Sequence, residues 1–83
     1  MSVRYEVRIA KQVAEVIAEL PVAAREELRA ALLRAQDNPA AWPQADRYDL
    51  DDTVRVVTTE TVIAHYAVVQ PARHLWVFAV TTL

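Results

Sequence analysis

The 83-residue chain contains no glycine and no cysteine, and each absence excludes a class of structure. Without cysteine, neither a disulfide framework nor a thiolate metal site can form, and two histidines cannot complete a closed zinc site. Without glycine, the tight primed turns of two-residue hairpins are unfavourable. We therefore expect no metal and no cofactor, and a longer, looser loop is possible at Thr59-Glu60.

Long apolar runs are also missing, although 54% of the residues are apolar. No run approaches the roughly 20 residues of a membrane-spanning helix. The opening residues alternate charged and apolar side chains, unlike a signal peptide. The length suits a single domain, 1–83, with one modest core. We predict a soluble, cytoplasmic protein that does not contact a membrane.

Basic residues do not dominate the chain, whose formal net charge is −2. This balance argues against a strongly electrostatic nucleic-acid binder. Residues 37–60 hold six acidic side chains against two arginines, a local net charge of −4, so an anionic ligand has to avoid that segment. Lys11 is the only lysine, and the other basic side chains are arginines, whose planar fork suits carboxylate or phosphate.

The first half of the chain predicts one strand and two helices. Residues 3–9 alternate apolar and charged side chains, which is typical of a half-buried strand. From residue 10 the period becomes helical, and Pro21 ends this helix near residue 20. A second helix ends before Pro39. The expected core stripes are Val13, Val16, Ile17 and Leu20 in the first helix, and Ala24, Leu28, Ala31, Leu32 and Ala35 in the second.

The second half predicts three strands, at about 53–58, 61–69 and 74–81. An irregular connection over residues 38–52 precedes them, anchored by Trp42, Tyr48 and Leu50. The order is therefore β-α-α-β-β-β. We predict an α+β fold with an antiparallel sheet, in which the last three strands form a meander and the N-terminal helical hairpin covers one face.

The strand pairing decides which side chains share a face. A two-residue turn at Thr59-Glu60 would pair Arg55 with Ala64 and place Arg55 on the face of Tyr66, and a slip of one residue would reverse this. His65 and Tyr66 are adjacent, so they point to opposite faces. A four-residue loop at 70–73 sets Val69 opposite His74 and gathers His65, His74, Trp76 and Phe78 on one face. That face either stacks bases or forms the helix-covered core.

Several segments resemble the RelE/ParE superfamily of bacterial toxins. They are the opening "YEVRIAKQV", the helix break at "ELP", the helix end before Pro39, and "TVRVV" and "VIAHY" in the meander, and together they cover essentially the whole chain. The resemblance implies a cytoplasmic toxin bound to a cognate antitoxin encoded in the adjacent gene. RelE-like members cleave mRNA on the ribosome, whereas ParE-like members act on DNA gyrase.

The first hypothesis is a RelE-like toxin, a metal-independent endoribonuclease. RNA cleavage without a metal needs a proton acceptor, a proton donor and cations that stabilise the phosphorane. His65 is the candidate acid or base and Arg55 the candidate cation, which makes these two the predicted catalytic residues. The candidate nucleic-acid contacts are Arg47, Arg73 and His74.

The alternative is a binding protein, either a ParE-like gyrase inhibitor or an inactive module that only binds an antitoxin. The acidic segment 37–60 favours this alternative. Each candidate residue also has an ordinary interpretation. His65 can be a structural strand residue, Arg55 a surface charge or partner contact, and Tyr66 a core side chain next to apolar Ala64 and Val68.

Overall fold

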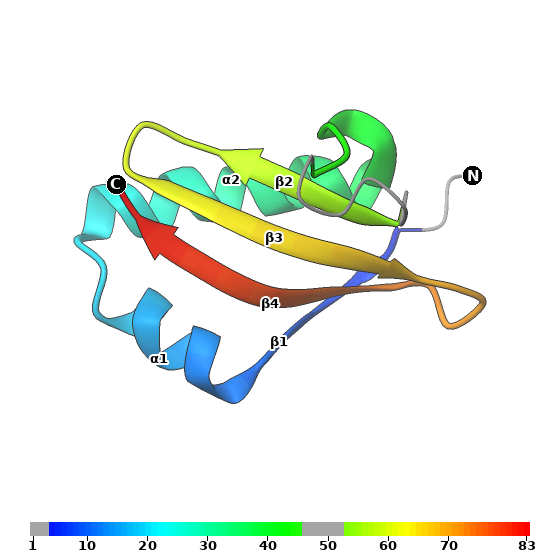
Figure 1. Cartoon of the computed structure of the whole chain (residues 1–83), viewed down its shortest axis with the longest axis horizontal. Helices are drawn as coiled ribbons and strands as arrows, with labels where there is room; N and C mark the ends of the chain where they lie inside the picture. The colour runs from blue at the N-terminus through cyan, green and yellow to red at the C-terminus, as the bar shows by residue number, and fades with distance from the viewer. Residues whose placement is uncertain (1–3, 46–52) are drawn as a thin grey trace.

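The computed structural model describes residues 4–45 and 53–83, and its elements follow the predicted β-α-α-β-β-β order with one short 3-10 helix added. Figure 1 shows the two helices and the sheet that they cover. The N-terminal part holds β1 (Glu6–Ile9), α1 (Lys11–Ala18), α2 (Val22–Asp37) and the 3-10 helix η1 (Pro39–Ala41). The C-terminal part holds β2 (Val54–Thr58), β3 (Val62–Val69) and β4 (His74–Thr82).

The four strands form one sheet in the order β1-β4-β3-β2. Strands β2, β3 and β4 make the predicted antiparallel meander. Strand β1 joins the sheet beside β4 but runs parallel to it, with Val7 opposite Leu75. The sheet is therefore mixed and not wholly antiparallel, because α1 and α2 return the chain before the meander begins.

The connection between β2 and β3 is longer than two residues, as the lack of glycine allows. The hydroxyl oxygen of Thr59 accepts hydrogen bonds from the backbone N–H groups of Thr61 and Val62, at 3.2 and 3.0 Å. Arg55 consequently pairs with Tyr66, and the pairing predicted with Ala64 is wrong by two residues. A shift of two residues preserves the face, so Arg55 and Tyr66 still share one side of the sheet.

The pairing between β3 and β4 begins as predicted, with Val69 opposite His74. It then shifts between His65 and Tyr66, which pair with Ala79 and Val77. The extra residue in β4 is therefore Phe78, and such a bulge bends and twists the strand that carries it.

The helices pack against one face of the sheet (Figure 1), and Pro21 precedes α2 in the short connection between them. The buried residues of α2 are Ala24, Leu28, Ala31, Leu32 and Ala35, which is the predicted stripe. In the first stripe Val13 and Leu20 are buried, but Val16 is 38% exposed, so its assignment to the core is wrong. The helical residues form one cluster with sheet residues Val57, Val62, Ala64, Tyr66, Leu75 and Val77.

The chain after α2 is tied to both layers. The indole N–H of Trp42 donates to the carbonyl of Ala31 at 3.0 Å, and the guanidinium of Arg34 lies 5.1 Å from the centre of the Trp42 ring. The phenol of Tyr66 donates to the carbonyl of Pro39 at 2.5 Å. Trp42 is thus the predicted anchor, whereas Tyr48 and Leu50 lie outside the described residues.

Candidate functional site

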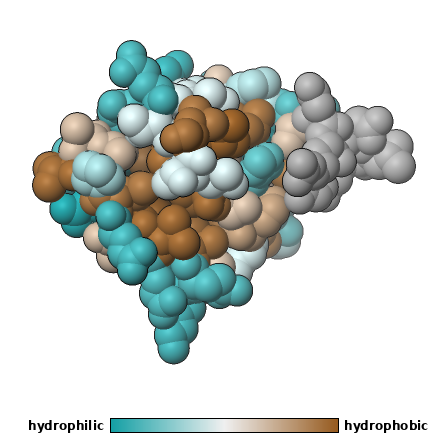
Figure 2. All heavy atoms as spheres, turned by 60° about the vertical axis from the view of Figure 1, so that its left-hand side comes forward, coloured by the Kyte–Doolittle hydropathy of each residue, from teal (hydrophilic) through white to brown (hydrophobic). Residues whose placement is uncertain are grey.

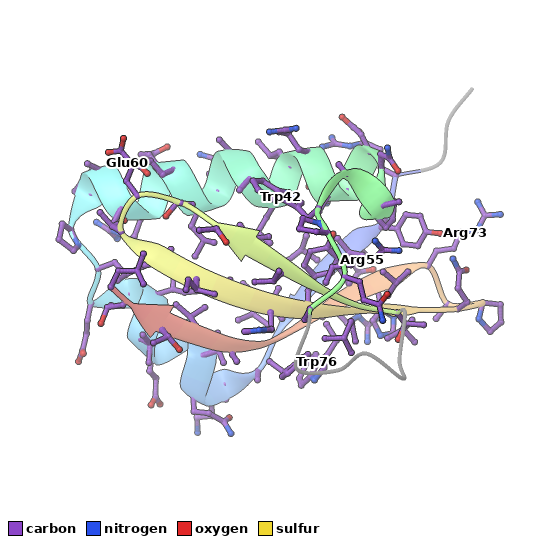
Figure 3. The ribbon with its side chains drawn as sticks, turned by 45° about the horizontal axis from the view of Figure 1, so that its top comes forward. Trp42, Arg55, Glu60, Arg73 and Trp76 are labelled. Carbon is purple, nitrogen blue, oxygen red and sulfur yellow. The ribbon has the colours of Figure 1, made fainter. Side chains whose placement is uncertain are left out.

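The sheet face opposite the helices gathers histidine and aromatic side chains. Ala64 and Tyr66 point into the core, so His65 between them points to the other face. The rings of His65 and Phe78 lie 6.1 Å apart with a tilt of 37°. Trp76 projects from the same face and is 39% exposed. In Figure 3 it lies on the other side of the sheet from Trp42. The open face, as we call it, is therefore not the helix-covered core.

Charged residues lie at the β1 edge of the open face. In the parallel pairing Glu6 is opposite His74 and Arg8 is opposite Trp76. Arg8 and Glu6 form an exposed salt bridge of 3.1 Å, which is worth little to stability because both side chains are solvated. His74 is half-buried, and the open face therefore combines two histidines, a tryptophan and an arginine.

His65 and His74 do not form a histidine pair. His65 pairs with Ala79, whereas His74 pairs with Val69, four residues farther along β3. At about 3.3 Å per residue this separates the two positions by roughly 13 Å along the strand. On the open face, His65 is consequently the histidine near the middle of β3 and His74 the one near the hairpin end.

Arg73 lies in the turn between β3 and β4. Its backbone has φ 57°, an uncommon value for a residue other than glycine, and its carbonyl accepts a hydrogen bond of 3.1 Å from the backbone of Glu6. The side chain is exposed and extends away from the sheet (Figure 3). This exposed position suits contact with a macromolecular partner better than catalysis on a small molecule.

Arg55 lies on the helix-covered face, near the end of the sheet that η1 covers. Its guanidinium is half-buried and donates to the carbonyl of Trp42 at 3.3 Å. Figure 3 shows Arg55 and Trp42 in the same region of the molecule. Across the strand pair, Tyr66 is fully buried. Burial raises the pKa of Tyr66 to about 12, although the positive charge of Arg55 acts in the opposite direction. The phenol therefore keeps its proton at neutral pH and is no general base.

The predicted pair of catalytic residues is not brought together. Arg55 shares a face with Tyr66, and His65 points to the opposite face, so the two side chains cannot line one surface site. The register of the β2–β3 hairpin therefore does not bring Arg55 and His65 to the same face of the sheet. Of the predicted nucleic-acid contacts, Arg73 and His74 lie together at the β3–β4 hairpin, and Arg47 lies outside the described residues.

Two grooves in the surface were not predicted from the sequence. One, of about 360 Å³, lies at the η1 end of the sheet and includes Arg55 and Tyr5. The other, of about 270 Å³, lies between β1, α1 and α2 and is lined mainly by apolar side chains, with Arg25 and Arg29 among them. The first groove joins residues that are distant in sequence. The second joins one face of α2 to residues of β1 and α1, and no spacing in the chain could have revealed that these elements meet.

Residues 4–45 and 53–83 contain no group of three or more histidine, cysteine or acidic side chains placed to hold a metal ion. Among the helices of this part of the chain, none has the length and apolar character needed to cross a membrane.

Comparisons with known proteins identify the fold. No family model and no curated protein matches the sequence. The structure matches that of the E. coli toxin RelE, with two arginines replaced by alanine, in complex with an antitoxin RelBc peptide. The TM-score is 0.77 at 15% sequence identity, and the match covers 96% of this chain and 82% of that one. The chain therefore has the RelE fold.

Proposed function

We propose that this chain is the toxin of a toxin–antitoxin pair and that it cleaves mRNA on the ribosome. The observation that carries the proposal is the RelE fold, which extends over 96% of the chain. A shared fold supports a function only by analogy, so the chemistry has to be argued from the residues.

The open face is where the chemistry is assigned. His65 has a side chain able to exchange a proton near neutral pH, as either general acid or general base. Its neighbour Phe78 and the exposed Trp76 offer ring faces on which RNA bases can stack. Arg73 and His74 at the hairpin supply contacts to the RNA backbone beside this surface. Arg55, on the other face, is not part of this site.

A cognate antitoxin is the proposed protein partner. The apolar groove between β1, α1 and α2 suits such a partner, because Ile9 and Leu33 remain 37% and 41% exposed in or beside it. Apolar side chains ringed by hydrophilic ones also gather on the face shown in Figure 2. Exposed apolar surface of this kind marks protein-binding sites. Arg25 and Arg29 at the groove favour an acidic segment of the antitoxin.

A second candidate function is favoured by one specific observation. Because Arg55 and His65 lie on opposite faces, the cation and the titratable base that were predicted to act together do not meet at one point. A toxin that acts by binding, such as an inhibitor of DNA gyrase, does not need such a combination.

Expression of the chain alone from an inducible promoter tests the proposal. We expect growth arrest, relieved when the small reading frame next to its gene is expressed as well, together with transcripts cut within codons. Growth arrest with intact transcripts, and loss of supercoiling by purified gyrase, would support the second candidate. Normal growth at confirmed soluble expression would overturn both.

A further inference from the structure

Arg8 is a strong cation on the open face, and no role has been assigned to it so far. It lies on β1 directly opposite Trp76 of β4, and its neighbour Val7 packs against the core. Because side chains alternate along a strand, the exposed side chain of Arg8 projects from the open face together with Trp76. A guanidinium beside an exposed indole offers a contact for a phosphate and a ring on which a base can stack.

The position of Arg8 in the sheet meets the restriction that the acidic segment 37–60 places on an anionic ligand. Strand β2 belongs to that segment, and in the order β1-β4-β3-β2 it forms the edge of the sheet opposite to β1. Arg8 and Trp76 both lie outside residues 37–60. A phosphate bound at the β1 edge therefore has two strands, β4 and β3, between itself and β2.

An ion pair within β1 occupies Arg8 in the free protein. The Nε group of Arg8 donates to Oε1 of Glu6 at 3.1 Å, and both side chains are exposed. Because the two groups remain solvated, this pair contributes little to stability and exchanges easily. A phosphate offers the guanidinium a bidentate, charge-assisted contact, which is stronger than one hydrogen bond to a solvated carboxylate. Glu6 is therefore a partner that a phosphate can replace.

We propose that Arg8 binds a phosphate of single-stranded RNA whose neighbouring base stacks on Trp76, and that Glu6 occupies Arg8 until the RNA displaces it. Arg8 thus raises the affinity of the open face for RNA, and Glu6 lowers it. The ligand is RNA because of the proposed function, on which this inference rests. Arg8 supplies the open face with the cation that Arg55, on the other face, does not provide.

The sheet sets the separation between Arg8 and His65. Trp76 pairs with Ala67, which lies two residues from His65 on β3. Arg8 is thus two strand spacings, about 10 Å, across the sheet from His65 and two residues, about 7 Å, along it. At this separation the two side chains contact neighbouring nucleotides of one strand, so Arg8 holds the RNA and His65 exchanges the proton. Loss of Arg8 should therefore raise KM more than it lowers kcat.

A second pair of arginine and carboxylate in the chain serves as a matched control. Arg4 pairs with Asp37, the last residue of α2, at 3.0 Å. The two side chains are 54% and 66% exposed, against 57% and 67% for Arg8 and Glu6. The two pairs carry the same charges at similar exposure, but Arg8 adjoins Trp76 whereas Arg4 is tied to the end of α2.

The test is fluorescence anisotropy of a labelled, single-stranded RNA dodecamer titrated with the full-length protein in the absence of ribosomes. Arg8→Gln should weaken binding at least about fivefold and reduce the slope of log affinity against log salt concentration by about 0.7, the value for one phosphate contact on a single strand. Glu6→Gln should tighten binding about threefold, because the phosphate no longer competes with an exposed carboxylate. If the wild type shows no measurable affinity for the RNA, the inference is wrong.

The control variants separate a contact at Arg8 from general attraction between charges. Arg4→Gln and Asp37→Asn change the net charge by the same amounts as Arg8→Gln and Glu6→Gln, and both should leave the affinity unchanged. If Arg4→Gln weakens binding as much as Arg8→Gln, no specific contact exists at Arg8. If Asp37→Asn tightens binding as much as Glu6→Gln, Glu6 does not compete with the RNA. All four positions are exposed, so every variant should keep the melting temperature of the wild type.

Cleavage of mRNA on ribosomes distinguishes failure of this inference from failure of the proposed function. We expect Arg8→Gln to raise KM at least about fivefold and to change kcat less than about twofold. Cleavage with an unchanged KM would overturn the inference and leave the proposed function intact. RNA binding that depends on Arg8, without cleavage by the wild type, would support the inference and overturn the proposed cleavage.

Discussion

The phenol of Tyr66 and the carbonyl of Pro39 are joined by a 2.5 Å hydrogen bond that fixes the segment after α2 to the centre of the sheet. Tyr66 is fully buried, and Arg55 lies across from it on β2. This one contact therefore positions Pro39 in the wall of the groove that includes Arg55, and it closes the core at its η1 end. It also explains why the tyrosine of the "VIAHY" motif is structural.

Replacement of Tyr66 by phenylalanine should lower the free energy of unfolding by about 1–3 kcal/mol. The variant keeps the ring in the core but leaves the Pro39 carbonyl without its donor, and a buried polar group without a partner carries that cost. Urea denaturation of the two proteins at pH 7 measures the difference. Equal stability would mean that water replaces the phenol at Pro39.

The same residue predicts loss of stability in alkali. The folded pKa of Tyr66 is about 12 and the ordinary value is 10.0, so between these values the unfolded chain loses the proton first. Stability therefore decreases as pH rises from 10 to 12, by about 2–3 kcal/mol in total. Denaturation from pH 9 to pH 11.5 should show a larger decrease for the wild type than for Tyr66→Phe. Parallel curves would show that the phenol ionises in the folded state without hindrance.

Two leucines of α2 provide a matched test of the core. Leu28 is 1% exposed and Leu33 is 41% exposed, and both lie within the helix. Leu28→Ala should cost about 2–5 kcal/mol because it leaves a cavity between α2 and the sheet. Leu33→Ala should cost less than about 1 kcal/mol. Similar losses for both variants would mean that helix propensity or a bound partner, and not burial, sets the stability of α2.

His65 is the residue on which the cleavage proposal depends. His65→Gln should reduce mRNA cleavage on ribosomes at least about tenfold, because general acid–base catalysis typically contributes a factor of about 10²–10⁴. The free energy of unfolding should change by less than about 1 kcal/mol. His74→Gln is the matched control, and it should weaken RNA binding more than it lowers the rate at saturation. Full activity together with a destabilised fold would make His65 a structural residue.

Local patterns predicted much of this fold. The apolar period of α2 identified all five of its buried residues, and the alternation in β3 placed His65 and Tyr66 on opposite faces. Both results follow from geometry within a single element. The lack of glycine pointed to the longer β2–β3 loop that Thr59 organises.

Relations between elements could not be read in the same way. Alternation in residues 3–9 indicates a strand but not the direction of its neighbour, so the parallel pairing of β1 with β4 was missed. Val16 is apolar and correctly spaced, yet α1 packs mainly on β4 and of its residues only Val13 is buried. The pairing of Arg55 depended on a loop length that no residue specifies.

The candidate sites show the same limit. The sequence identified Arg55 and His65 as candidate catalytic residues but could not show whether they share a face of the sheet. That relation depends on the register of the β2–β3 pairing. Tyr5, Asn38 and Gln70 meet Arg55 in the groove from three distant parts of the chain. Only the structure shows that these residues line one groove.

The most direct test of the central claim is cleavage of a defined mRNA by the purified protein on purified ribosomes. Primer extension maps the new 5′ ends with and without ribosomes, in buffer that contains a chelator after the complex has been isolated. The account predicts cuts within codons that require the ribosome and disappear with His65→Gln. Intact mRNA in the presence of ribosomes, from a preparation whose folding is verified, would contradict it.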